Sequence, residues 1–320
     1  MRALKTALLI AGVIILGYLV YRIGAGAIVD ALAQLTWWQS TLICLPYALI
    51  TAADTFAWRF AFAGGGAPYW RLYGARLAGE ALNLVTAVGS VGGEAAKAWL
   101  IRRDVTYEES VPAVVIAKTT IVMAQAVFLV IGIVLAWIAL PIDSEVLQGM
   151  LWLLVIEVVA VGGFVGVQIA GLVARMGRLL ARLGVVAAPE YAAQLDRALR
   201  DYYRRDWRRL SLSVLFHTLG WLLGALEAFV MLWALAVPAG ALAATVIEAL
   251  GSGVRFATFL VPASLGAFEG ANAAAFGALG YGAAAGIAFS LVRRARQAVW
   301  IVIGLLVLGA MRWRDGRAAA

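Results

Sequence analysis

Charged residues that stand inside apolar sequence are the groups of this chain whose chemistry most needs an explanation. The stretch EALGSGVRFATFLVPASLGAFEG, residues 248–270, carries Glu248, Arg255 and Glu269 together with Pro262 and four glycines. Helix-breaking residues free backbone groups that hydrocarbon cannot hydrogen-bond, so protein or a water-filled cavity must surround them. Ionisable residues at membrane depth are functional candidates by default. The stretch therefore predicts one half of a substrate pathway.

A second broken stretch, EALNLVTAVGSVGGEAAKAWLI at residues 80–101, has a similar mixture of charge and glycine. Glu94 and Lys97 are three residues apart and would share a helix face. Free amide groups at Gly92–Gly93, and at Gly266 in the other stretch, are expected to provide dipoles that bind an anion. Both stretches therefore offer groups suited to binding an anion.

Three arginines, Arg293, Arg294 and Arg296, lie inside the last apolar run. On a helix Arg293 and Arg296 face one way, while Arg294 is rotated by about 100°. The planar guanidinium fork suits a phosphate. The candidate substrate-binding residues are Glu80, Asn83, Glu94, Lys97, Lys118, Glu227, Glu248, Arg255, Glu269, Arg293, Arg294 and Arg296. The candidate backbone or hinge positions are Gly92, Gly93, Pro262 and Gly266.

Several charged residues also have a purely structural interpretation. The pair Glu94–Lys97 is then an ordinary ion pair, and Glu157 and Glu227 each hydrogen-bond a neighbouring helix. His217 is then a packing or interfacial residue, and Asp54 is an interfacial residue near the end of its helix. Because the chain has one Cys and one His, no Cys/His metal site is expected, and no cofactor is expected either.

Composition identifies the kind of protein that must position these groups. The 320 residues are 64% hydrophobic and 14% charged, with a mean hydropathy of +0.91, which is typical of an all-α polytopic protein of the bacterial inner membrane. The net charge of +8 does not indicate nucleic-acid binding, because most arginines lie between apolar runs. There they set topology and contact anionic lipid headgroups. Residues 174–210 contain nine arginines, so this segment is expected in the cytoplasm.

The apolar runs predict about six membrane-spanning helices in a single domain, residues 1–320, with both termini cytoplasmic. They lie near residues 6–21, 37–62, 111–140, 150–173, 211–237 and 283–311. The first is expected to be retained rather than cleaved as a signal peptide, because its apolar run is long for one. Residues 69–79 are expected to form an amphipathic interfacial helix.

The two broken stretches are expected to be re-entrant helical hairpins. Basic residues flank 80–101 on both sides, so it dips from the cytoplasm, whereas 242–280 lies between an outward and an inward helix and dips from outside. Both stretches contain Glu-Ala-Leu followed by a glutamate further on. We therefore predict an inverted repeat with halves at about 37–140 and 211–311, in which Glu94 and Glu269 are equivalent. Such repeats are usual in secondary transporters.

At these residues the chain resembles the transmembrane, flippase-like domain of the lysylphosphatidylglycerol synthase family, in particular stand-alone members associated with hopanoid biosynthesis. The resemblance covers essentially the whole chain, and its motifs are GGEAAK at 92–97, WLLGALE at 221–227, the block at 247–270, and SLVRRARQ at 290–297. It implies a protein that moves a phospholipid or a related polar lipid between leaflets. The chain departs from the family pattern at Ala263, where Gly is usual, and at Phe268, where Gln is expected.

A lipid flippase or transporter is therefore the leading expectation, with a membrane lipid, phospholipid or hopanoid-type, as its partner. Synthase activity is not expected, because no region resembles the soluble synthase domain. Two alternatives remain: a non-transporting membrane partner of a lipid biosynthetic enzyme, and an integral-membrane lipid-modifying enzyme. The enzyme is disfavoured because the sequence offers no nucleophile–base pair, metal set or phosphate-binding loop. No oligomeric state is predicted.

Overall fold

The computed structural model describes residues 35–85, 91–172 and 189–317, and all regular structure in these ranges is helical. The first half contains α3 (Trp37–Arg59), α4 (Tyr69–Val85), α5 (Val91–Leu100), α6 (Tyr107–Ala139) and α7 (Glu145–Ile169). The second contains α9 (Pro189–Arg205), α10 (Trp207–Ala234), α11 (Ala241–Ala257), the 3-10 turn η1 (Pro262–Ser264), α12 (Ala267–Ala278) and α13 (Ala283–Arg317).

Four helices in the described residues are long and apolar enough to cross a membrane, namely α3, α6, α7 and α10. The chain is thus a polytopic helical membrane protein, as its composition predicts. The expected span at 6–21 lies outside the described residues. The expected span at 283–311 forms the first part of α13, which continues to Arg317. Much of the apolar surface of α7 is exposed in the isolated chain, as expected of a helix that faces lipid.

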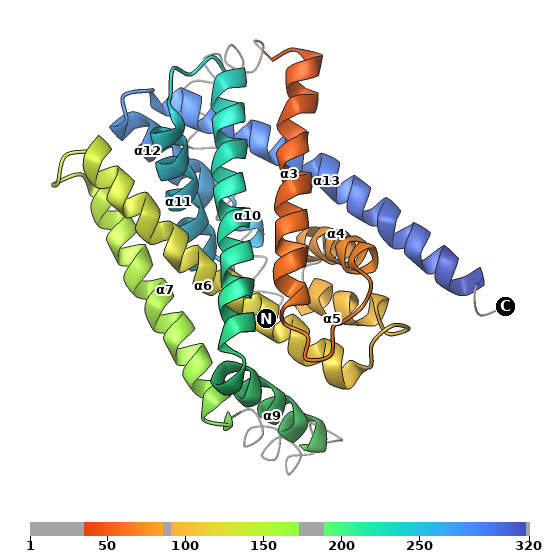
Figure 1. Cartoon of the computed structure of the whole chain (residues 1–320). Coiled ribbons are helices and arrows are strands. Elements are labelled where there is room, and N and C mark those ends of the chain that lie inside the picture. Colours follow the sequence, from red (N-terminus) through yellow and green to blue (C-terminus); the bar gives the residue numbers. More distant parts are fainter. Residues whose placement is uncertain (1–34, 86–90, 173–188, 318–320) are drawn as a thin grey trace.

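Two antiparallel helices, α3 and α10, pack side by side along the middle of the molecule (Figure 1). The α4–α5 hairpin lies toward one end of this pair and the α11–α12 hairpin toward the other. Contacts between the halves are reciprocal, because α4 packs against α13 while α11 packs against α6. Each hairpin therefore rests on a long helix of the other half.

Glycines allow the close approach of helices at both of these reciprocal contacts. A Cβ atom at Gly304 of α13 would lie 2.5 Å from the Leu77 carbonyl oxygen of α4. A Cβ atom at Gly132 of α6 would overlap the Cβ atom of Ala249 on α11. Small residues at such crossings let membrane helices gain van der Waals contact, which replaces the hydrophobic driving force that lipid removes.

The first hairpin differs from the sequence-based expectation. Residues 69–79 do not form a separate interfacial helix, since α4 runs without a break from Tyr69 to Val85. Glu80 therefore lies inside a helix rather than at the start of a dipping segment. Gly92 and Gly93 do not form a break either, because they lie in the first turn of α5. The expectation failed because Arg76 is buried against a carboxylate, which removes the amphipathic surface that the sequence suggested.

The second hairpin is broken at the proline, as expected. Pro262 begins the turn η1, and Ala263 and Ser264 adopt left-handed backbone angles with φ of 52° and 49°. Gly266 also has a positive φ, 80°, and precedes α12. A left-handed alanine is strained relative to glycine, so the glycine that the family resemblance implies at position 263 would fit this turn better.

Buried apolar side chains form two separate clusters, one toward each end of the molecule. The larger joins α6, α7, α10, α11, α12 and α13, and it includes Phe128, Met231 and Phe289. The smaller joins α4, α5, α9 and the adjoining ends of α3 and α6, and it includes Trp58 and Leu72. The helices that carry the candidate charged residues contribute to both clusters. Apolar packing therefore fixes the frame in which those charges meet.

Candidate functional site

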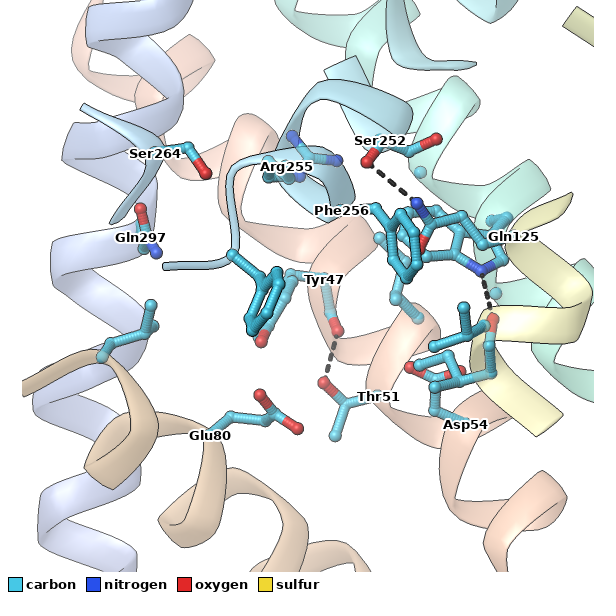
Figure 2. A pocket seen from close by; sticks show the side chains of 18 of the residues that line it. Tyr47, Thr51, Asp54, Glu80, Gln125, Ser252, Arg255, Phe256, Ser264 and Gln297 are labelled. Carbon is cyan, nitrogen blue, oxygen red and sulfur yellow. Dashed lines mark hydrogen bonds between the residues drawn. The ribbon is translucent and has the colours of Figure 1, made fainter. Parts of the chain in front are cut away.

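A cavity of about 880 Å³ lies among α3, α4, α6, α7, α10, α11 and α13. It is lined by ten charged residues, namely Asp54, Arg76, Glu80, Lys118, Glu227, Glu248, Arg255, Arg293, Arg294 and Arg296. Six of these are basic and four acidic, so the lining carries a net charge of +2. Figure 2 shows Arg255 on one side of the cavity, with Glu80 and Asp54 on the opposite side. Helices of both halves of the chain thus supply charge to one space.

Two buried glutamates hold three arginines on the wall made by α10, α11 and α13. The Arg293 guanidinium donates to Glu248 and, over 3.1 Å, to Glu227. Arg296 also donates to Glu227, and Arg255 donates to Glu248 over 3.0 Å. Arg293 and Arg296 thus share a partner, as expected from their common helix face. Buried charges are tolerated only when paired in this way.

Arg294 points away from Arg293 and Arg296, toward the turn η1. Its Nε lies 2.5 Å from Glu269 Oε1, and its Nη2 donates to the Ala263 carbonyl oxygen over 3.3 Å. Glu269 in turn accepts the Gly266 amide over 2.7 Å, so it caps the first turn of its own helix. The left-handed turn at Ala263 therefore positions a carbonyl and a carboxylate around one arginine.

A second ion-pair network joins α4, α5 and α6. Lys97 Nζ donates to Glu80 Oε1 over 2.7 Å and to Glu94 Oε1 over 3.0 Å. Lys118 Nζ lies 3.7 Å from the same Glu94 oxygen. Asn83 donates to Glu94 over 3.3 Å and accepts the Gly93 amide over 2.8 Å. This network holds the first hairpin closed and leaves Glu80 and Lys118 facing the cavity.

A third group connects α3, α4 and α10. Asp54 Oδ2 accepts from Arg76 Nη2 over 2.8 Å, and Asp54 Oδ1 lies 2.6 Å from Nδ1 of His217. All three side chains are buried, although Asp54 and Arg76 reach the cavity surface. Asp54 can lie against α10 because residue 220 is a glycine. A Cβ atom added at this position would be 2.9 Å from Asp54 Oδ1.

Aromatic rings lie beside three of the cavity arginines, and the Arg293 guanidinium carbon is 5.7 Å from the ring centre of Phe289. The Arg255 guanidinium carbon lies 4.9 Å from the ring centre of Phe268, and that of Arg296 lies 4.6 Å from the ring centre of Tyr47. Such contacts favour a cation that has little water around it. The departure at Phe268 thus provides a ring beneath Arg255, where a glutamine would offer an amide instead.

Most of the predicted binding residues are brought together by the fold. Those that line the cavity are Glu80, Lys118, Glu227, Glu248, Arg255, Arg293, Arg294 and Arg296. Four predicted residues do not line the cavity: Asn83, Glu94, Lys97 and Glu269. Lys97, Glu94 and Glu269 pair with the lining residues Glu80, Lys118 and Arg294 in that order, and Asn83 hydrogen-bonds Glu94. Glu94 and Glu269 each lie in the first turn of the second helix of a hairpin.

Two expectations are wrong. The amides of Gly93 and Gly266 are not available to an anion, because Asn83 and Glu269 already accept from them. Glu157 does not hydrogen-bond a neighbouring helix, since its fully buried carboxylate oxygens have no hydrogen-bond partner among the described residues.

Three residues of the site, Asp54, Arg76 and His217, were not singled out as binding residues from the sequence. Arg76 was expected at the membrane interface and His217 in a packing role. The available signal was that Asp54 and His217 are ionisable residues within apolar runs, one on each central helix. Their pairing across 163 residues becomes visible only when α3 and α10 lie side by side.

Apart from its charged residues and a few uncharged polar ones, among them Thr51, Gln125 and Gln297, the cavity wall is apolar and aromatic. The apolar part of the wall includes Leu84 of α4, Phe164 of α7, Phe256 of α11, and Phe259, which follows α11. Leu84, Phe164 and Phe259 are exposed in the isolated chain, so the cavity reaches a surface that lipid would cover. Among the described residues no group of three or more His, Cys, Asp or Glu is placed to hold a metal ion. The site thus combines a charged interior with an apolar opening, as expected for an amphipathic ligand.

Fold and site together define a polytopic helical membrane protein with a charged internal cavity. The family model described as "Lysylphosphatidylglycerol synthase TM region" matches residues 4–306, and the chain belongs to this family. This membership associates the chain with membrane-lipid function. The comparison with curated proteins found no match. The comparison with solved structures found none either.

Proposed function

We propose that this protein moves a phospholipid, or a related polar lipid such as a hopanoid-type lipid, between the leaflets of the bacterial inner membrane without making or breaking covalent bonds. The observation that carries the proposal is the cavity in which charged side chains from both halves of the chain meet beside an apolar opening. A polar headgroup can occupy the charged space while its acyl chains stay in the surrounding lipid. Membership of the lipid-related family supports the same class of substrate.

The accessible cations of the cavity are suited to a phosphate. The side chains of Lys118, Arg255 and Arg294 are 47%, 34% and 23% exposed, whereas those of Arg293 and Arg296 are each 9% exposed. The two buried arginines are already neutralised by Glu227 and Glu248. A headgroup phosphate therefore first meets the accessible Lys118, Arg255 and Arg294 side chains. The charge-assisted hydrogen bonds that these cations form favour an anion.

We further propose that α3–α6 and α10–α13 form an inverted repeat whose hairpins are re-entrant and alternate during transport. The antiparallel central pair and the hairpins at opposite ends support this arrangement (Figure 1). Ion pairs at the two hairpins, Arg255–Glu248 and Lys118–Glu94, are the contacts that a phosphate would exchange. Transport then proceeds by exchange of ion-pair partners, so that no charge is exposed to hydrocarbon.

The exposed arginines of α9 and the start of α10 would rest on anionic headgroups at the cytoplasmic surface. Arg197, Arg204, Arg205 and Arg208 are exposed, and α9 carries its apolar residues on the opposite face, where Leu199 and Tyr202 are buried. Basic residues close to an anionic leaflet are attracted to it. This contact supports an orientation in which both termini are cytoplasmic.

The test is lipid movement in liposomes that contain the purified protein and a fluorescently labelled phospholipid. Arg255→Ala and Glu94→Gln should slow transbilayer movement by about 10-fold or more, since about 1.4 kcal/mol per lost interaction corresponds to a factor of 10. Arg59→Ala and Glu108→Gln remove the same kinds of charge at exposed positions outside the cavity and should leave the rate unchanged.

Movement by both cavity variants at the unmodified rate would overturn the proposed mechanism. Absence of any movement by the unmodified, correctly folded protein would instead favour a non-transporting partner of a lipid biosynthetic enzyme. A new lipid species in the extracted liposomes would favour a lipid-modifying enzyme.

A further inference from the structure

We propose that Asp54 and His217 form a proton-binding site in the cavity wall and that binding of an anionic headgroup is coupled to uptake of a proton there. This inference rests on the proposed function, because it names the ion that accompanies the lipid. It concerns residues of the two central helices, α3 and α10, that neither the sequence motifs nor the ion pairs of the hairpins include.

The geometry at His217 leaves one ring nitrogen free. Nδ1 lies 2.6 Å from Asp54 Oδ1, so in the neutral imidazole Nδ1 donates to the carboxylate and Nε2 carries the lone pair. Nε2 is buried and has no hydrogen-bond partner in the described part of the chain. The lone pair on Nε2 is the position that can take up a proton, and the carboxylate on the other nitrogen then balances the resulting imidazolium.

Charged side chains of the neighbouring helices surround this pair. Arg76 and Glu80 act on it from α4 and Lys97 acts from α5, while Lys118 of α6 lines the same cavity. Tyr47 lies two turns before Asp54 on α3. Arg76 already bonds Asp54 over 2.8 Å. An added proton therefore introduces positive charge beside existing cations, unless negative charge arrives with it.

An anionic headgroup would supply that negative charge. Arg76 and Asp54 both line the cavity, as does the accessible Lys118. A phosphate that has entered beside Lys118 and then reaches Arg76 competes with Asp54 for the guanidinium. Asp54 is then free to balance a protonated His217. Because coupling between two sites is reciprocal, the proton strengthens binding of the anion by the same factor. The lipid headgroup and the proton would thus bind in the cavity together.

The close contact between Asp54 and α10 requires a glycine on α10. The Gly220 position faces Asp54, and a Cβ atom there would lie 2.9 Å from Asp54 Oδ1. Any other residue at position 220 would displace the carboxylate from the helix that carries His217. The proton-binding site therefore depends on Asp54, His217 and Gly220 of α3 and α10. The ion pairs proposed to exchange with the lipid phosphate belong instead to the hairpins and α6.

The single histidine of the chain permits a direct measurement. Protein labelled with ¹⁵N-histidine, purified through a histidine-free tag and placed in phosphatidylcholine nanodiscs, has one imidazole to observe by NMR. We expect a neutral ring with the proton on Nδ1 at neutral pH, and a proton affinity that rises about 10-fold when glycerol 3-phosphate is added, within the range usual for linked sites. Sodium chloride at equal ionic strength should produce no such rise.

A ring whose titration is the same in glycerol 3-phosphate and in chloride would overturn the coupling. So would a ring that remains uncharged at every pH at which the protein stays folded. Arg76→Gln should remove the effect of glycerol 3-phosphate while the imidazole signal persists. Because this measurement needs no transport, its failure is separate from a failure of the proposed flippase function.

Transport provides the second test. In liposomes with an entrapped pH indicator, movement of labelled phosphatidylglycerol by the unmodified protein should change the internal pH, and an imposed pH gradient should bias the final lipid distribution. His217→Gln should abolish both signals, whereas Thr218→Val, an isosteric change one residue further along α10, should preserve them. Lipid movement that ignores the pH gradient in the unmodified protein would refute proton coupling and leave the proposed lipid transport standing.

Discussion

Glu227 is the residue whose neighbours most clearly explain why charge persists in this apolar chain. One carboxylate, fully buried, bonds both Arg293 and Arg296, and Glu248 bonds Arg293 and Arg255. Taking such charges out of water costs several kcal/mol per ion, which only close pairing offsets. The arrangement thus keeps three arginines in place at the cavity wall by sharing two carboxylates among them.

Replacing Glu227 should therefore cost far more than replacing a surface acid. Glu227→Gln leaves two buried guanidinium groups short of a counter-charge, and the expected loss of stability is about 3–5 kcal/mol. Asp201→Asn removes the exposed partner of Arg205 and should cost about 0–1 kcal/mol. Thermal unfolding in detergent, followed by tryptophan fluorescence, measures both. Equal losses in the two variants would contradict this account of the buried pairs.

Ala263 allows a prediction with the opposite sign. Its φ of 52° lies in the left-handed region, so Ala263→Gly should raise stability by about 1 kcal/mol, because glycine adopts this conformation without a Cβ clash. Ala274→Gly, at an exposed position inside α12, should lower stability by about 1 kcal/mol. The same unfolding measurement compares them, and a destabilised Ala263→Gly protein would show that the turn is not strained.

At the scale of elements, helix position was predictable and helix contact was not. The boundaries of α3, α6, α7 and α10 fall within a few residues of the apolar runs at 37–62, 111–140, 150–173 and 211–237. Apolar length determines these helices, because hydrocarbon requires every backbone group to be satisfied within the segment. The extent of α4 was mispredicted, since the buried partner of Arg76 belongs to another helix.

The glycine crossings give a test at this scale. Gly304→Ala places a methyl group 2.5 Å from the Leu77 carbonyl oxygen, so α4 and α13 must move apart, with an expected cost of about 1–3 kcal/mol. Gly309 lies on the same helix, where a Cβ atom would meet no described atom within 4 Å, and Gly309→Ala should be neutral or slightly stabilising. Thermal unfolding of the pair reports whether the crossing, rather than helix propensity, governs stability. Similar melting temperatures would argue against tight packing at Gly304.

At the scale of the whole molecule, the proposed orientation can be tested by labelling. In a Cys44→Ala background, Gly65→Cys and Arg103→Cys lie in the connections after α3 and α5, whereas Ile142→Cys and Ala239→Cys lie in those after α6 and α10. A membrane-impermeant thiol reagent should reach the first two from the cytoplasmic side and the last two from the other side. Labelling of all four positions from one side would contradict the inverted arrangement.

The sequence by itself determined the class of this protein, its family motifs and most of its candidate binding residues. Apolar run length, arginine placement and charge inside broken helices are local properties, and the bilayer makes each of them costly to violate. Only the tertiary structure decided which charges meet. Asp54 pairs with His217 because α3 and α10 pack antiparallel, and Glu227 pairs with Arg293 because α13 crosses α10. Partner choice depends on side-chain distances of a few ångströms between residues far apart in sequence, and no local pattern encodes those distances.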